Sequence, residues 1–296
     1  MPEKRRVEKR TLVAAVLVIL CIPAVIAVNI LFFEDRSYYA TSFIIIALAM
    51  VPFALVFESR KPMARELVVI AVMVAIAVAG RAAFFMVPGF KPVVALVIIA
   101  GAALGAESGF AVGALTGFLS NFIFGQGPWT PWQMFAFGII GFLAGLIFYR
   151  LASAIGAPSR DGSMRSAEPR GDGSSGTEPK GDGSSGTDDK WYDTNRLGAN
   201  VSARKRVERL RIAVLCIFGG LITFMLYGIL LDTAATVMFS HGEFSPNALL
   251  ATYIAGIPMN AVHATATIFF LLLLARPMIE KLERVKKKYG LLGAEA

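Results

Sequence analysis

The feature that most constrains this chain is a succession of apolar runs, each close to the length of a helix that crosses a lipid bilayer. Such a helix needs about 20 predominantly apolar residues. Only 17% of the 296 residues are charged, whereas soluble domains carry about 25%. The chain is therefore predicted to be an all-α integral membrane protein. The expected spans are Thr11–Phe33, Tyr39–Phe57, Glu66–Met86, Phe90–Leu104, Ser108–Gly125, Met134–Leu151, Leu210–Leu231 and Leu249–Leu274.

The distribution of basic residues decides the number of spans. The apolar stretch from Val93 to Phe124 is long for one helix and short for two. The positive-inside rule places basic clusters in the cytoplasm. Such clusters occur at Lys4–Arg10, Arg60–Arg65, Arg204–Arg211 and Lys281–Lys288. They all fall on one side only if the stretch forms two short helices that join at Glu107. We therefore expect eight spans in the plasma membrane, with both termini in the cytoplasm.

The spans and the regions between them divide the chain into five segments. The expected segments are two N-terminal transmembrane helices (1–62), four core helices (63–154), a disordered cytoplasmic linker (155–205), the last two core helices (206–280) and a basic cytoplasmic tail (281–296). The linker contains a ten-residue repeat, Gly171–Lys180 and Gly181–Lys190. With so few apolar residues it cannot offset its ordering entropy by burial. In the last part we also expect an outer loop at Asp232–Pro246 and a helix interrupted at Gly256–Pro258.

Several kinds of chemistry lack support in this sequence. Cys21 and Cys216 both lie inside apolar runs, so neither a disulfide framework nor a zinc site is expected. The chain has no P-loop and no His-Glu-x-x-His motif, and we expect no cofactor and no metal. Its net charge of +8 comes from short runs at span ends, a pattern that encodes topology and not nucleic-acid binding. Ser120 and His263 offer an intramembrane serine protease dyad, but the Gly-x-Ser-Gly of such enzymes is absent around Ser120.

A rigid turn, Gln126–Gln133, separates two apolar runs near the middle of the chain. Pro128 and Pro131 fix the backbone and remove two donors, so this turn is preset. It also carries Trp129 and Trp132. Tryptophans at a helix end are typical of a membrane interface, and they would equally suit a structured outer loop that caps a ligand.

Polar side chains inside predicted spans are costly and therefore point to function. Tyr253, Asn260 and His263 are spaced so that they share one face of the last span, and Asn121 lies toward the outer end of the fifth. A structural histidine that bonds across helices is the alternative for His263, and Arg81 is interpreted as a side chain that extends to the interface. The residues expected to bind a substrate that enters from outside are Asn121, Gln126, Trp129, Trp132, Gln133, Tyr253, Asn260 and His263.

Small residues recur at every fourth position in two regions. The glycines are Gly101, Gly105, Gly109, Gly113 and Gly117, and the alanines are Ala71, Ala75 and Ala79. This spacing lets helix backbones approach closely in lipid. For the glycines it predicts internal packing, whereas for the alanines packing and contact with a partner protein remain equal alternatives.

Residues Glu66–Ala275, without the linker, resemble the substrate-binding S components of energy-coupling factor (ECF) vitamin transporters. The matching features are the alanine-spaced helix, the Pro88-Gly89 turn, the glycine-rich pair around Gly105–Gly117 and the segment Gly138–Gly145. The Phe124–Gln133 turn is similar to that of S components assigned to cobalamin or its benzimidazole precursors.

This resemblance implies a six-helix core that binds a vitamin from outside through its outer loops and last three helices. It also implies a motor of two ABC ATPases joined by a transmembrane T subunit, which would pack on Ala71, Ala75 and Ala79. The two N-terminal helices and the long linker depart from the family pattern. A structural or assembly membrane protein is the alternative to a transport subunit, and the serine protease is a third possibility. For the proposed pocket we expect a flat or largely aromatic vitamin or precursor.

Overall fold

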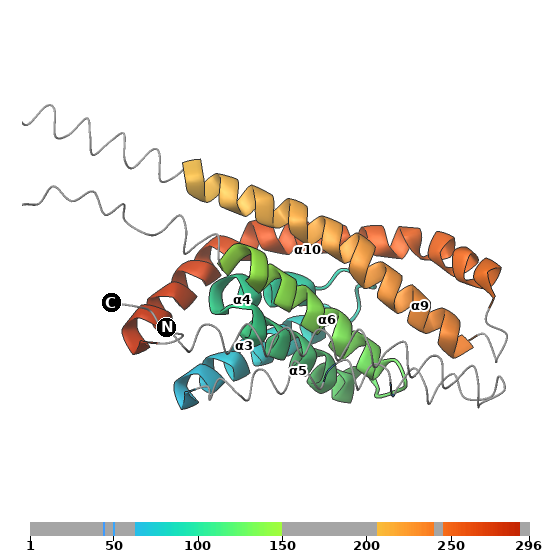
Figure 1. Ribbon diagram of the computed structural model, residues 1–296, viewed down its shortest axis with the longest axis horizontal. Helices are drawn as coiled ribbons and strands as arrows, with labels where there is room; N and C mark the ends of the chain where they lie inside the picture. Colours follow the sequence, from blue (N-terminus) through green and yellow to red (C-terminus); the bar gives the residue numbers. More distant parts are fainter. Residues whose placement is uncertain (1–43, 45–49, 51–62, 150–205, 240–244, 291–296) are drawn as a thin grey trace, which may run out of the picture.

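The computed structural model describes residues 44, 50, 63–149, 206–239 and 245–290. Within these residues all regular structure is helical (Figure 1). The α-helices are α3 (Ala64–Ala83), α4 (Val93–Leu104), α5 (Ala106–Phe124), α6 (Thr130–Ala144), α9 (Gly228–Phe239) and α10 (Pro246–Tyr289). Two π-helical turns, η1 (Gly145–Tyr149) and η2 (Thr223–Tyr227), follow α6 and precede α9, and residues 206–222 are also α-helical. The fold is therefore all-α, as predicted.

Four helical segments of the described region are long and apolar enough to cross a membrane: Ala64–Ala83, Thr130–Tyr149, Arg206–Met238 and Pro246–Tyr289. The stretch that was ambiguous in the sequence forms two helices, α4 and α5. They join at Gly105, whose φ of 96° suits glycine, while Glu107 lies in the first turn of α5 and not in the connection. The two helices expected within 1–62 fall almost entirely outside the described residues, as does the linker 155–205, so eight spans stay a prediction.

The short helix α4 lies at the centre of the bundle, and all twelve of its residues are buried. Glycines bring α4, α5 and α6 into backbone contact around it. A Cβ atom added to Gly101 or Gly109 would overlap the carbonyl oxygen of Gly141, and one added to Gly113 would overlap the backbone of Phe137. The repeat at Gly101–Gly117 therefore serves internal packing, because only a residue without a side chain permits such close approach.

The second half of the bundle differs from the sequence prediction in its boundaries. The outer loop expected from Asp232 starts later, because α9 continues to Phe239 and includes Asp232. α10 is a single helix of 44 residues that runs through Pro258 without interruption. Proline is tolerated inside transmembrane helices when neighbouring groups satisfy the freed backbone. α10 also continues through the first nine residues of the expected tail, to Tyr289.

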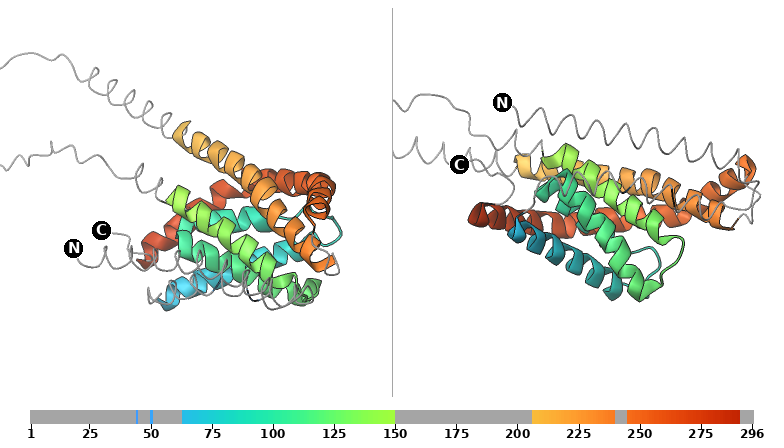
Figure 2. Two further views of the ribbon diagram at one scale, coloured as in Figure 1. Left: turned by 45° about the vertical axis from the view of Figure 1, so that its right-hand side comes forward. Right: turned by 60° about the horizontal axis from the view of Figure 1, so that its bottom comes forward.

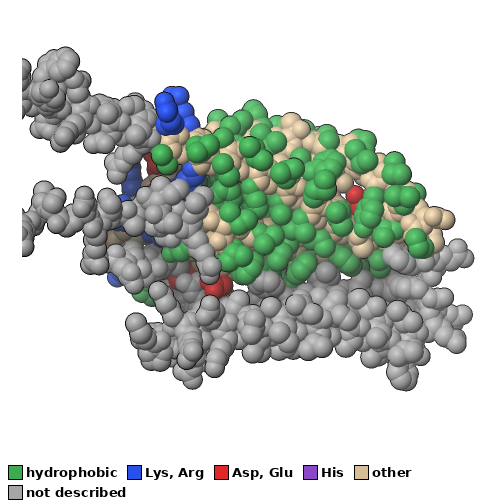
Figure 3. Space-filling view, turned by 45° about the horizontal axis from the view of Figure 1, so that its top comes forward, with side chains coloured by type: hydrophobic (Ala, Val, Ile, Leu, Met, Phe, Trp, Pro, Cys, Tyr) green, Lys and Arg blue, Asp and Glu red, His purple; other side chains and the backbone are tan. Residues whose placement is uncertain are grey.

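Most charged residues of the described region lie at one end of a largely apolar body. At 1.5 Å per residue α10 is about 66 Å long along its path, roughly twice the thickness of the hydrocarbon core of a bilayer. Lys and Arg side chains gather at one end of the molecule, while hydrophobic side chains cover the rest of this face (Figure 3). α3 begins, α10 ends and the helix from residue 206 begins at this same end (Figures 1 and 2).

Candidate functional site

Arg81 is the centre of a polar network at the end of α3 opposite the basic end of the bundle. Its side chain is only 9% exposed, so the sequence interpretation of an arginine that extends to the interface is wrong. Nη1 of Arg81 donates to Oγ of Ser120 and to Oδ1 of Asn121, the latter at 2.9 Å. The guanidinium carbon also lies 4.4 Å from the centre of the Phe124 ring. A cation inside a membrane helix is costly without such partners, and α5 supplies all of them.

The network continues from Asn121 into the turn before α6. Nδ2 of Asn121 donates to Oγ1 of Thr130 (3.0 Å), which also accepts from the backbone N–H of Gly127 (3.2 Å). The Thr130 hydroxyl donates to Oε1 of Gln126 (2.9 Å), and Nε2 of Gln126 donates to the carbonyl of Phe118 (3.1 Å). Asn121 and Gln126, both expected at the site, are thus joined through Thr130, which the sequence analysis did not single out.

The two tryptophans of the turn have different environments. The ring of Trp129 is 38% exposed and lies so close to Gly127 that a Cβ atom there would overlap it. Trp132 is buried and packs against Ala234 and Met238 of α9. The two indole rings therefore do not form an equivalent pair of exposed aromatic surfaces. Nε1 of Trp132 and Oε1 of the adjacent Gln133 are buried and find no hydrogen-bond partner among the described residues, and each such group costs about 1–3 kcal/mol.

A second polar network joins α9 to α10. Nδ2 of Asn260 donates to Oδ2 of Asp232 at 2.8 Å, and the hydroxyl of Tyr253 lies 2.8 Å from Oγ1 of Thr233. Asp232 also lies against Gly256, where an added Cβ atom would overlap its carboxyl group. Both α10 residues predicted here are thus directed toward α9. Their partners, Asp232 and Thr233, were not among the predicted site residues.

His263 lies beside a stack of aromatic rings. Its ring centre is 5.4 Å from that of Tyr227, which stacks on Phe137 at 5.3 Å with an angle of 12° between the planes. Nδ1 of His263 is 2.9 Å from the carbonyl of Met259, so this nitrogen carries the proton and Nε2 is the acceptor of the neutral ring. Ser120 accepts from Arg81 and donates to the carbonyl of Gly117 (3.3 Å). The two residues therefore do not form a Ser–His dyad.

Lys91, in the connection between α3 and α4, adds a second cation near Arg81. Its Nζ lies 4.9 Å from the centre of the same Phe124 ring that Arg81 contacts. Burial, and then the charge of Arg81, lower the pKa of Lys91. Arg81, Lys91 and Asp232 are all close enough to His263 to interact with it electrostatically. The region around His263 and Tyr227 therefore lies between the two networks, although no hydrogen bond between described residues connects them.

Ala71, Ala75 and Ala79 lie on a different face from this site. All three are exposed, whereas Ile70, Met73, Val74 and Ala77 of the same helix are buried in the core. The alanine-spaced face of α3 therefore points away from the other described helices.

These observations define an all-α multi-pass membrane protein with two polar networks, one between α3 and α5 and one between α9 and α10. Residues 61–158, which contain α3 to α6, match the family model of the ECF-type riboflavin transporter, S component. Over these residues the chain is similar to S components of ECF type, in agreement with the resemblance found in the sequence. The cobalamin or benzimidazole-precursor subtype is not confirmed. Comparison with curated proteins and with solved structures gave no match.

The matched family indicates a general role for the chain. S components of this family are vitamin-binding membrane subunits of ECF transporters and not enzymes. Ser120 bonds to Arg81 and Gly117 and not to His263, so the protease alternative is discarded. The family also implies a small-molecule substrate and a T-subunit and ATPase module in the plasma membrane.

Proposed function

We propose that this chain is an ECF-type S component that captures a flat, largely aromatic vitamin at the outer face of the membrane. The observation that carries this proposal is the Arg81 network, in which Asn121, Thr130 and Gln126 connect a buried cation to the outer turn. A network of this kind fixes the turn relative to α3 and α5 before a ligand arrives. Such preorganisation lowers the entropy cost of binding.

In the proposed pocket, residues Gln126–Gln133 form the roof, and Tyr253, Asn260 and His263 line the floor. The Phe137–Tyr227 stack offers an aromatic wall, and binding pockets combine such walls with a few polar groups. The unpartnered Nε1 of Trp132 and Oε1 of Gln133 are a donor and an acceptor that a ligand with complementary groups would satisfy. The partly exposed ring of Trp129 then covers the bound ligand from outside.

Riboflavin is the first candidate substrate, because the matching family model is described by that name. Its planar ring system carries both hydrogen-bond donors and acceptors, as the proposed pocket requires. Cobalamin and its benzimidazole precursors, which the Phe124–Gln133 turn suggested, are the second candidates.

Delivery of the substrate requires the T subunit and two ABC ATPases. We place the T subunit on Ala71, Ala75 and Ala79, because this small-residue stripe is exposed and allows a partner helix to approach closely. In this arrangement all eight spans are present, both termini and the linker are cytoplasmic, and the Arg81 network faces outward.

The direct test is a titration of the purified full chain in detergent without ATP. We expect riboflavin to bind at one site with roughly micromolar or tighter affinity, about −8 kcal/mol or stronger, and its fluorescence to be quenched. 5,6-Dimethylbenzimidazole and cyanocobalamin are titrated in parallel. Preferential binding of either of these two compounds would change the proposed substrate but leave the proposed site unchanged. Binding of none of the three compounds would contradict the proposal and favour an assembly role.

A further inference from the structure

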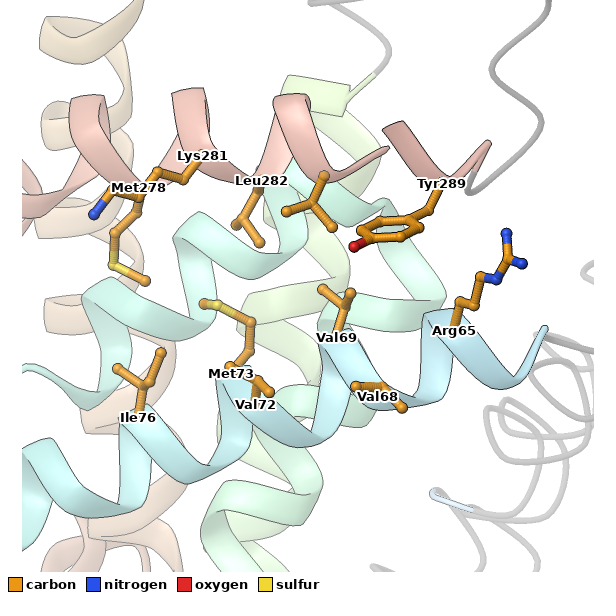
Figure 4. Close-up of a pocket in the computed structure, with 11 residues that line it drawn as sticks. Arg65, Val68, Val69, Val72, Met73, Ile76, Met278, Lys281, Leu282 and Tyr289 are labelled. Carbon is orange, nitrogen blue, oxygen red and sulfur yellow. The ribbon is translucent and has the colours of Figure 1, made fainter. Parts of the chain in front are cut away.

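A long apolar groove runs between α3 and the last part of α10, at the basic end of the bundle (Figure 4). Its volume is about 460 Å³. Its main apolar lining comes from Val68, Val72, Ile76, Met278, Leu282 and Val285. From Met278 to Tyr289 the groove is about 16 Å long at 1.5 Å per residue. That length is close to the depth of one leaflet of a ~30 Å hydrocarbon core.

Cationic side chains lie at one end of this groove. Arg65 and Tyr289 line it and are seen together at that end (Figure 4). The guanidinium carbon of Arg65 is 5.9 Å from the centre of the Tyr289 ring, and Nζ of Lys288 is 5.5 Å from the same point. Both cations therefore lie against the same aromatic ring. Lys281, farther along α10, also lines the groove.

Acidic side chains on the same two helices do not neutralise these cations. Each has a partner elsewhere: Glu66 accepts from Ser108 (2.9 Å), Glu280 pairs with Arg276 (3.2 Å) and Glu283 pairs with Arg211 (3.3 Å). Glu66 is also buried. Within the described part of the chain, no carboxylate pairs with Arg65 or Lys288. Two cations beside the same ring at the end of an apolar groove are complementary to an anion that carries an apolar chain.

We propose that this groove binds one anionic phospholipid. Its phosphate lies between Arg65 and Lys288, and one acyl chain lies along the apolar walls. Basic pockets between transmembrane helices bind anionic head groups for the same electrostatic reason. A free phosphate ion would leave the apolar walls unused, and a zwitterionic lipid would bring a cation of its own to the basic end. The proposal concerns the end of the bundle opposite the Arg81 network and is independent of the vitamin that binds there.

The test is native mass spectrometry of the purified full chain. The protein is equilibrated with an equimolar mixture of dioleoylphosphatidylglycerol and dioleoylphosphatidylcholine before release from the detergent. We expect one retained lipid per chain, with a strong preference for phosphatidylglycerol. In the double variant Arg65→Gln/Lys288→Gln, retention should fall about thirtyfold, because each of the two cations near an anionic head group contributes about 1 kcal/mol. The matched control Arg284→Gln/Lys287→Gln removes the same charge from exposed positions of α10 that do not line the groove.

A second variant separates the groove from general charge attraction. Val72→Phe fills the groove at an exposed position and leaves every cation in place, so it should also reduce lipid retention. Equal retention of both lipids, or equal losses in the double variant and its control, would overturn the proposal. So would full retention in Val72→Phe. Thermal unfolding of each variant checks that the bundle remains folded.

Discussion

The two halves of the described bundle are held together by different means. Between α4, α5 and α6, glycines such as Gly109 and Gly141 bring backbones into direct contact. Between α9 and α10, side-chain hydrogen bonds such as that from Asn260 to Asp232 make the connection. Backbone contacts leave no space for an added side chain and hold these helices rigidly. Side-chain hydrogen bonds can instead be exchanged for bonds to a ligand, so we expect the two halves to respond differently to substitution.

The largest effect is expected at Gly109. A Cβ atom there would overlap the carbonyl oxygen of Gly141, and overpacking of this kind costs about 1–3 kcal/mol. Gly109→Ala should therefore lower the Tm by roughly 5 °C in a bundle of this size, as measured by differential scanning fluorimetry. Leu115→Ala, at an exposed position of the same helix, is the control. An unchanged Tm for Gly109→Ala would mean that α5 and α6 are not in backbone contact.

In the polar half, Asn260→Ala should weaken substrate binding more than it weakens the fold. The substitution leaves the Asp232 carboxyl without its amide partner and removes a polar group from the proposed floor. We expect a loss of about tenfold or more in affinity, equivalent to ~1.4 kcal/mol, in the riboflavin titration. Asn247→Ala, at an exposed position of the same helix, should bind as the wild type does. Equal losses in both variants would remove Asn260 from the site.

Substitution on the exposed face of α3 should weaken association with the partner protein and should disturb neither half of the bundle. Ala75→Leu places a branched side chain where the proposed T subunit must approach closely. Co-purification with the T subunit and ATPases should fall several-fold, while substrate affinity stays unchanged. Ala251→Leu makes the same change at an exposed position of α10 and should leave co-purification intact. Lost substrate binding with retained association would contradict the proposed interface.

The smallest effect is expected in the linker. Residues Gly171–Lys190 are polar and repetitive, so they should contribute little folding energy. Replacing them by a few residues should leave substrate affinity within experimental error. A large loss of affinity would show that this segment packs against one of the two halves.

The described helices were largely predictable because hydropathy and glycine spacing are local properties of the sequence. The inward orientation of the glycines in Gly101–Gly117 follows from their spacing, whereas the split between α4 and α5 was inferred from the distribution of basic residues. The orientation of Arg81 was not predictable in this way, because its partners Ser120 and Asn121 reach it only when α5 packs against α3. A single charged residue inside an apolar span, such as Arg81, nevertheless indicates a side chain with buried partners.

The site itself was predicted only in part, and the reasons are physical. Asn121 and Gln126 do share a network, but Thr130, which joins them, has no special sequence pattern. Asp232 was assigned to a loop because a charge normally marks the end of an apolar run, whereas its bond to Asn260 makes it acceptable inside α9. The exposure of Trp129 and the burial of Trp132 depend on how α6 meets α9.

The central claim is that the network from Arg81 to the outer turn holds the substrate site in place, and Thr130→Val tests it most directly. Valine has nearly the same shape as threonine, but it leaves Asn121 and Gln126 without their shared partner. Thr252→Val is the control, because the Thr252 hydroxyl bonds only the carbonyl of Ala248 in its own helix among the described residues. We expect Thr130→Val to weaken riboflavin binding about tenfold or more, ~1.4 kcal/mol, and Thr252→Val to bind riboflavin normally. Wild-type affinity in a folded Thr130→Val variant would contradict the central claim.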